Sequence, residues 1–496
     1  MKMGGPERIA RLKAQGKLTA RQRLDLLLDP GSFKEVGLLA HSPHAELTDR
    51  TPADGMVVGR GTIDGRLVYV TADDATVLAG TRGRVAELKA GRMRDMALRD
   101  RAPFIALMEA GAARIQETYG AMAAGIGFRF ASHFNLSGKV PQVAAVMGAT
   151  FGGPSFTAMQ SDFVPIVEGT GFMGMSGPPV VKVGIGLETT SEEIGGAEIS
   201  AKETGQAHYW AKDEAECLRA IREFLSYMPA SCWEAPPHQP VAPARSDTEE
   251  GRRELSALVP DNHRRAYDMK RLIALIVDGG SLFEIQAHYG ISLITGLARI
   301  DGQSVGIVAN QPLRLAGTID PKAVRKARRF VDLCDAFHIP LVFLMDCPGF
   351  LVGPDVERQG MVGLTTRLLT SMIQADVPII TIVIRKAIGL AYIALGGRAV
   401  SPDALVAWPT ARFDVMGPDA AIELVHGKDI RAAADPAARR TEITRKVELE
   451  SSAYAAAGLG HIDEVIEPIE TRRVIVETLA RRRGKQSFTW KHRIDP

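Results

Sequence analysis

The clearest pattern along the chain is an apolar run that ends in glycines. Residues 140–156 read VPQVAAVMGATFGGPSF, and every side chain from 143 to 147 is apolar. A continuous apolar run of this length predicts a buried strand. Gly152 and Gly153 follow where a helix can begin, and the first backbone N–H groups of a helix have no partner within it. The pattern therefore predicts free N–H donors above a sheet.

The same pattern occurs a second time in the chain. Residues 377–392 read VPIITIVIRKAIGLAY, and Gly152 and Gly389 are 237 positions apart (389 − 152). Further pairs with this spacing are Pro141 and Pro378, segments 63–65 and 300–302, segments 78–81 and 315–318, and Pro103 and Pro340. One constant spacing over so many positions indicates a duplication, with two copies of one domain in the chain.

Strand patterns alternate with helix patterns in each copy. The first copy predicts a hairpin at 55–72, a helix at 83–101 and a strand at 103–107. Helices at 214–227 and 471–483 close the two copies. This alternation predicts an α/β fold with binding sites at the carboxyl ends of the strands.

A proline-rich stretch separates the two copies. Prolines 236, 237, 240 and 243 interrupt the pattern, and a charged run follows. We therefore expect an N-terminal domain at 1–235, a linker at 236–265 and a C-terminal domain at 266–496.

Composition excludes several classes of protein. The chain has 60 basic and 58 acidic residues, so we expect neither a nucleic-acid partner nor a membrane surface. Its most apolar stretch contains Arg385 and Lys386, which argues against a membrane span. The N-terminus has no apolar core typical of a signal peptide, and the four cysteines form no C-x-x-C pair. We expect a cytoplasmic protein without a metal site.

Several segments together resemble one known family. These are residues 19–33 (TARQRLDLLLDPGSF), 61–70, 111–117 (GAARIQE), 148–153 (GATFGG), 305–312, 327–353, 385–392 (RKAIGLAY) and 461–468. The chain resembles the carboxyltransferase (β) subunit of biotin-dependent acyl-CoA carboxylases, particularly the propionyl-CoA carboxylase β type. The resemblance implies two duplicated crotonase-like domains built from ββα repeats, an N-terminal acyl-CoA side, a C-terminal biotin side, and a homo-hexamer.

The resemblance also implies the chemistry. The carboxyl group of carboxybiotin moves to the α-carbon of an acyl-CoA through an enolate, and a biotin carrier and a biotin carboxylase are the partners. Carried over by residue, the N–H groups of Gly152 and Gly153 hold the thioester carbonyl, and those of Leu390 and Ala391 hold the ureido carbonyl of biotin. Backbone donors of this kind stabilise the negative oxygen that develops during such a transfer.

Seven further residues are candidates for substrate binding. They are Arg82, Gly111, Ala112, Arg114, Gly389, Tyr392 and Ile393. The family reads Ser-Gly-Gly-Ala-Arg before the arginine, alanine at Pro154, and Gly-Gly-Ala-Tyr-Asp at 389–393, so the chain departs from its relatives at each place. Leu390 narrows the slot for biotin. Ile393 offers an apolar wall in place of aspartate, which predicts an acyl group longer or more apolar than acetyl.

Some alternatives remain open from the sequence. Arg82, Arg84, Lys89, Arg92 and Arg94 could meet the phosphates of CoA or form a solvated helix face. Arg114 could orient the substrate or form a structural ion pair. The alternatives to carboxyl transfer are a biotin-independent acyl-CoA decarboxylase or other thioester transfer on the same fold, and a non-catalytic assembly subunit.

Overall fold

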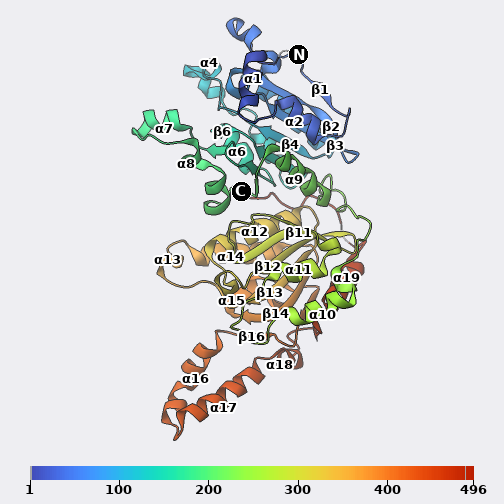
Figure 1. The fold of residues 1–496 in the computed structure, drawn as a ribbon, viewed down its shortest axis with the longest axis vertical. Coiled ribbons are helices and arrows are strands. Elements are labelled where there is room, and N and C mark those ends of the chain that lie inside the picture. Colours follow the sequence, from blue (N-terminus) through green and yellow to red (C-terminus); the bar gives the residue numbers. More distant parts are fainter. Residues whose placement is uncertain (1–2, 486) are drawn as a thin grey trace. The chain divides into compact units, whose positions relative to one another are not determined.

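The computed structural model describes residues 3–485 and 487–496, and its chain divides into two compact units (Figure 1). Unit 1 comprises Met1–Pro236 with Phe488–Pro496, and unit 2 comprises Pro237–Ser487. In each unit, strands alternate with helices around a sheet whose buried side chains form the core. The expected α/β fold is confirmed.

The unit 1 sheet has the strand order β1-β2-β3-β4-β5-β7-β9. Its first three strands are antiparallel, and the others continue parallel to β3. A separate two-stranded sheet of β6 and β8 carries the glycine turn. The strands are β1 (Lys34–Val36), β2 (Met56–Ile63), β3 (Arg66–Asp73), β4 (Phe104–Met108), β5 (Gln142–Val146), β6 (Ala149–Phe151), β7 (Pro165–Val167), β8 (Phe172–Gly174) and β9 (Tyr209–Ala211). The helices are α1 (Pro6–Ala14), α2 (Ala20–Leu27), α3 (Arg84–Arg99), α4 (Ile115–Thr118), α5 (Ala131–Phe134), α6 (Gly153–Met159), α7 (Pro178–Ile185), α8 (Ser191–Gly195) and α9 (Glu214–Tyr227).

The unit 2 sheet has the order β10-β11-β12-β13-β14-β15-β17, and β16 also pairs with β14. Helices α16 and α17 pack together and extend away from this sheet (Figure 1). The strands are β10 (Leu282–Glu284), β11 (Leu293–Ile300), β12 (Gln303–Asn310), β13 (Leu341–Cys347), β14 (Ile379–Ile388), β15 (Ala404–Ala407), β16 (Arg412–Asp414) and β17 (Glu464–Val465). The helices are α10 (Glu249–Leu258), α11 (Met269–Ile276), α12 (Pro321–Ala336), α13 (Pro354–Glu357), α14 (Met361–Gln374), α15 (Gly389–Ala394), α16 (Pro418–Ala432), α17 (Pro436–Glu450), α18 (Ala453–Gly458) and α19 (Thr471–Arg482).

The duplication is visible element by element. Strand β2 begins at Met56 and β11 at Leu293, again 237 positions apart (293 − 56), and the starts of β3 and β12, α3 and α12, β4 and β13, and β5 and β14 keep the same spacing. The backbone agrees in detail, because Ala79 and Ala316 both have positive φ angles, of 55° and 53°. The two units therefore repeat one chain path.

One buried lysine serves the same purpose in each copy. The amine of Lys89 on α3 donates hydrogen bonds to the carbonyls of Ala53 and Met56, at 2.8 and 2.7 Å. Lys326 on α12 donates to the carbonyls of Tyr289 and Leu293, at 3.1 and 2.7 Å. Each lysine satisfies main-chain acceptors where the hairpin begins.

The boundaries between the copies differ from the expected ranges. Of segment 236–265, expected as a linker, all but Pro236 lies in unit 2, and it contains α10, whose Leu255 is buried in the unit 2 core. The final segment, Phe488–Pro496, belongs to unit 1. There the Ile494 N–H donates to the Ser137 hydroxyl at 2.9 Å. Among the described residues, no helix is long and apolar enough to cross a bilayer.

Candidate functional site

The first glycine turn joins β6 to α6 in unit 1. Gly152 has a φ of 69°, which favours glycine, and its N–H donates to the Gly174 carbonyl at 2.9 Å. The Gly153 N–H, at the first position of α6, has no partner within the described part of the chain. Pro154 follows and carries no N–H. Of the two donors expected here, Gly153 is the one left available.

The loop after β4 lies against this turn. Ala112 has a φ of 77°, and its Cβ lies 3.7 Å from the point that a Cβ on Gly152 would occupy. The Arg82 N–H donates to the Ala112 carbonyl at 3.0 Å, which fixes the loop beside the start of α3. The Ala112 N–H has no hydrogen-bond partner among the residues the structure describes. Ala112 and Gly153 therefore offer two backbone donors from opposite segments.

Arg114 holds the loop after β4 in place through buried ion pairs. Its guanidinium is 0% exposed and pairs with the carboxylates of Asp54 and Glu117, at 2.5 and 2.7 Å. Glu117 in turn accepts from the Ser42 hydroxyl at 2.6 Å and from the Arg84 N–H at 2.7 Å. Of the two alternatives for Arg114, the structure shows the ion pair, which holds the loop that carries Ala112.

The basic cluster at the start of α3 is mostly buried. Arg82 pairs with Asp73 at 3.0 Å, and the buried Arg94 donates to the Ser132 hydroxyl at 2.6 Å. Lys89 is bound to main-chain carbonyls, as described above. Only Arg84 and Arg92 of the five are exposed. The prediction of a solvated helix face is therefore wrong for three of the five residues, because their partners come from other elements.

The second glycine turn, in unit 2, repeats the first. Gly389 has a φ of 66°, and a Cβ there would come within 3.2 Å of the Val415 carbonyl, so the backbone conformation and the space both favour glycine. The Ile319 N–H donates to the Gly349 carbonyl at 3.1 Å, as Arg82 does to Ala112 in unit 1. Gly349 thus corresponds to Ala112, and Leu390, in the first turn of α15, corresponds to Gly153.

The remaining predicted residues of unit 2 cluster on α15. The Leu390 side chain is 70% exposed, so it lies at the surface of the unit, whereas Ala391 is buried. Tyr392 packs edge-on against Phe413, with ring centres 5.6 Å apart, and its hydroxyl accepts from the Arg398 N–H at 3.3 Å. Ile393 is half-buried. Leu390, Tyr392 and Ile393 therefore lie together on one short helix, α15.

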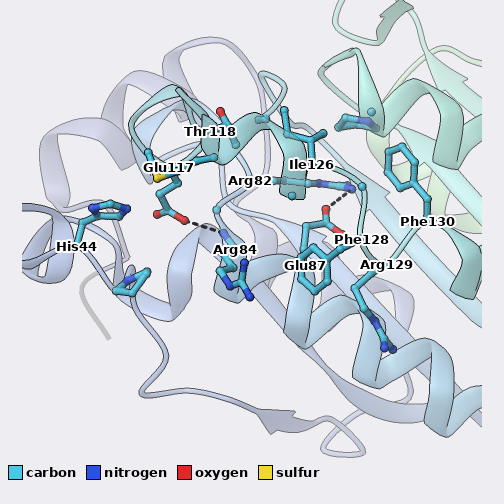
Figure 2. A pocket seen from close by; sticks show the side chains of 18 of the residues that line it. His44, Arg82, Arg84, Glu87, Glu117, Thr118, Ile126, Phe128, Arg129 and Phe130 are labelled. Carbon is cyan, nitrogen blue, oxygen red and sulfur yellow. Dashed lines mark hydrogen bonds and ion pairs between the residues drawn. The ribbon is translucent and has the colours of Figure 1, made fainter. Parts of the chain in front are cut away.

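Unit 1 has two cavities near the first glycine turn and the start of the chain. The first, of about 390 Å³, has Gly153 and Pro154 in its wall and is closed largely by Ala121, Met122 and residues 125–130 (Figure 2). The second, of about 760 Å³, lies beside α1 and the turn at Ala79. It carries the basic side chains of Arg8, Arg11 and Lys17, which sequence reasoning missed. The spacing of Arg8 and Arg11 on one helical face is the signal that could have found them.

Cys347 has no catalytic character. Its thiol is buried at the end of β13, and burial raises its pKa to about 12. A thiol that stays protonated is a poor nucleophile.

A family model described as the carboxyl transferase domain matches residues 11–494. The chain is 39% identical over 98% of its length to the propionyl-CoA carboxylase carboxyltransferase subunit of Haloferax mediterranei, covering 94% of that protein. It is 38% identical over 96% of its length to the methylmalonyl-CoA decarboxylase subunit alpha of Veillonella parvula, covering 92% of it. It is also 39% identical over 96% of its length to the methylmalonyl-CoA carboxyltransferase 12S subunit of Propionibacterium freudenreichii subsp. shermanii, covering 90% of it.

Solved structures show the same architecture. A transcarboxylase 12S crystal structure, described as a hexamer with methylmalonyl-coenzyme A and methylmalonic acid bound, superposes with a TM-score of 0.92 at 38% identity. The match covers 99% of this chain and 95% of that one. A single-chain, multi-domain long-chain acyl-CoA carboxylase gives a TM-score of 0.84 at 32% identity, with 96% of this chain and 48% of that chain covered. The two units are therefore the duplicated crotonase-like domains that the sequence predicted.

Proposed function

The chain belongs to the carboxyl transferase family as an acyl-CoA carboxyltransferase subunit, and we propose that it moves a carboxyl group between biotin on a carrier protein and the α-carbon of an acyl-CoA. The observation that carries this proposal is the repeated turn: Gly152 and Gly389 have nearly the same φ, and Gly152 directly precedes the short helix α6 while Gly389 is the first residue of the short helix α15. Two equivalent donor sites suit a reaction with two carbonyl groups.

The donors act on developing negative charge. When the α-carbon of the substrate loses its proton, the charge moves to the thioester oxygen. We assign the N–H groups of Ala112 and Gly153 to that oxygen, with Gly152 supplying the turn. Donors fixed in place before the reaction stabilise such an oxygen without reorganisation. Arg114 contributes by holding Ala112 in position, so it is a positioning residue.

The second turn fits the ureido carbonyl of biotin. The N–H groups of Gly349 and Leu390 occupy the positions that Ala112 and Gly153 have in unit 1, and Ala391 continues the same helical turn. A Cβ on Gly349 would meet no atom within 4 Å, so space remains beside that N–H. When bound, biotin on its carrier would supply the carboxyl group. The residues present therefore suit a flat, neutral carbonyl compound.

We place the CoA phosphates in the second cavity of unit 1. Arg8 and Arg11 are exposed there, next to the main chain of Thr76 and Ala79. Arginine side chains bind phosphate groups through charge-assisted hydrogen bonds. This placement replaces the one on α3, where Arg82 is already paired.

The direction of transfer and the assembly are also proposals. Relatives named as carboxylase, decarboxylase and transcarboxylase subunits are 39%, 38% and 39% identical to the chain, so the fold supports transfer in both directions. We propose carboxylation in a homo-hexamer that works with a biotin carboxylase and a biotin carrier subunit. A cytoplasmic location agrees with four buried cysteines, none of which forms a disulfide among the described residues.

The first experiment uses the purified chain with methylmalonyl-CoA and free biotin. We expect biotin-dependent formation of propionyl-CoA, measured by chromatography. Gly153→Val keeps its N–H, but its branched side chain should displace that donor from the thioester oxygen and lower the rate at least ~100-fold, as the loss of one oxyanion donor does. Its side chain would meet the Phe130 ring, whose Cζ lies 3.0 Å from the expected Cβ position. The control is Gly363→Val, at an exposed helical glycine with open space around it.

Three outcomes would contradict the proposal. Full activity of folded Gly153→Val would reject the oxyanion assignment. Equal turnover without biotin would favour the biotin-independent decarboxylase. Lack of turnover with biotin, and also with a carrier and a biotin carboxylase, would favour an assembly subunit.

A further inference from the structure

We propose that the 390 Å³ cavity beside Gly153 is an acyl-chain site that takes a linear, apolar acyl group of medium length. This inference rests on the proposed function, because it assumes that the thioester is held at Gly153. It goes further by naming the substrate class and the residues that select it.

The wall of the cavity is largely apolar. Its apolar side chains come mainly from the segment between α4 and α5 and are Ala121, Met122, Ile126, Phe128 and Phe130, together with Pro154. Met122, Ile126 and Phe128 are exposed to solvent in the chain. An acyl chain in the cavity would cover part of this apolar surface, and each methylene that it buries strengthens binding about fourfold.

Three charged residues around the cavity are already paired. Arg82 pairs with Asp73, Glu117 with Arg114, and Arg129 with Asp95. Arg84 lies over the Phe128 ring, 5.3 Å from its centre, and its guanidinium is exposed to solvent. An anionic group could therefore meet Arg84 at the exposed side of the cavity, whereas an apolar chain along the wall would require none of the three pairs to break.

The shape suits a chain that begins at the glycine turn. Phe130 touches the position beside Gly153, where the first carbons of an acyl group would lie. Figure 2 shows Phe130 at one end of the view and His44 at the other, with Arg84 and Phe128 between them. A volume of this size is within the range of small-molecule sites, which begins at about 300 Å³.

The wall is also free to adjust to a ligand. The turn Gly120–Gly125 buries none of its side chains, and Gly127 has a φ of 74°. A segment with few buried contacts opens at low free energy. We expect it to close around a bound chain.

The test measures binding, separately from turnover. Thioethers of CoA that carry an ethyl or an octyl chain cannot react, and calorimetry gives the Kd of each. We expect the octyl compound to bind the full-length protein at least ~10-fold more tightly, in line with the burial of several methylenes. Ala121→Phe, which fills the cavity, and Ile126→Asp, which makes it polar, should each remove this preference.

The matched control is Ala124→Phe, on the same exposed turn but outside the cavity wall. It should keep the preference for the octyl chain. Equal Kd values for the two thioethers in the parent protein would overturn the inference, as would an unchanged preference in both cavity variants. If the protein turns over propionyl-CoA and binds the ethyl thioether tightly, but binds the octyl thioether no more tightly, the acyl-chain site is rejected and the proposed function stands. Failure to bind either thioether would overturn the proposed function itself.

Discussion

Lys326 carries an amine that is buried in the folded protein. Burial lowers the pKa of its amine from 10.5 to about 7, and burial lowers that of Lys89 to about 8. The folded protein thus releases a proton that the unfolded chain keeps between pH 7 and 10.5. The free energy of unfolding rises with pH wherever the unfolded state binds more protons.

Lys326→Met should remove this pH dependence. In the parent, Lys326 contributes a rise in stability of up to about 1.4 kcal/mol per pH unit across that window. Methionine fills a similar volume and does not titrate. We expect the gain in Tm between pH 7.5 and 9.5 to be smaller in the variant. Lys446→Met, at an exposed position on α17, is the control, and an equal gain in all three proteins would reject the assignment.

At the scale of elements, α15 carries Leu390 and Ile393, for which the sequence predicts different roles: Leu390 beside biotin and Ile393 beside the acyl group. Leu390→Gly should lower the KM for free biotin, because it removes the side chain that narrows the slot. The loss of stability should stay near 1 kcal/mol, the helix-propensity difference at an exposed position. The measurement is initial rate against biotin concentration, and an unchanged KM would show that Leu390 does not narrow the slot.

Ile393→Asp tests the apolar wall that the sequence predicts for the acyl group. Ile393 lies on α15 in unit 2 and does not line the unit 1 cavity proposed for the acyl chain, so we expect the ratios of kcat/KM across a series of acyl-CoA lengths to match those of the parent. Ile126→Asp, in the cavity wall, is the matched comparison and should lower the preference for longer acyl-CoA. A weaker preference in Ile393→Asp would place this residue beside the acyl chain and restore the predicted wall.

Elements with a strong pattern were predictable from the sequence. Residues 143–146 of the apolar run are buried in β5, and Met147 is buried directly after it. The spacing of 237 positions holds for the starts of β2, β3, α3, β4 and β5 and of their counterparts. Gly152 was predictable as a turn because of its neighbours. The engagement of its N–H was not, because the acceptor Gly174 belongs to β8, which only the fold brings alongside.

Partners distant in the sequence explain the other differences. Arg94 and Lys89 stand in a row of like charges, yet their acceptors are Ser132 and the carbonyl of Met56. Prolines 236–243 indicated a linker, but the apolar Leu255 of α10 packs into the unit 2 core. A local sequence pattern shows where charged residues and prolines lie, but it does not show which distant residues will pack against them.

For the whole molecule, α7 is the element on which the proposed assembly can be tested. It reads PPVVKVGI and buries none of its side chains, with Val180, Val183 and Ile185 exposed by 60%, 89% and 75%. Contiguous exposed apolar surface is typical of contact sites, and under the proposed assembly we expect a second copy of this chain to cover α7. The chain alone leaves this helix uncovered.

Val183→Asp should therefore reduce the size of the assembly. A charge in an apolar interface is unfavourable without a partner, so light scattering should show smaller oligomers than the hexamer expected of the parent. Lys182→Gln on the same helix is the control and should leave the assembly intact. A hexamer in Val183→Asp would exclude α7 from the interface, and a monomeric parent would reject the assembly proposal.

The final segment has a consequence for how the protein is made. Phe488–Pro496 belongs to unit 1, whose other residues end at Pro236. The Trp490 indole donates to the Ser137 carbonyl at 3.2 Å, and Ile494 is buried. On the ribosome, the N-terminal half emerges long before these contacts exist, so unit 1 is completed only after residues 488–496 have been translated. A chain that stops before residue 488 would therefore lack part of unit 1, the unit that we propose binds acyl-CoA.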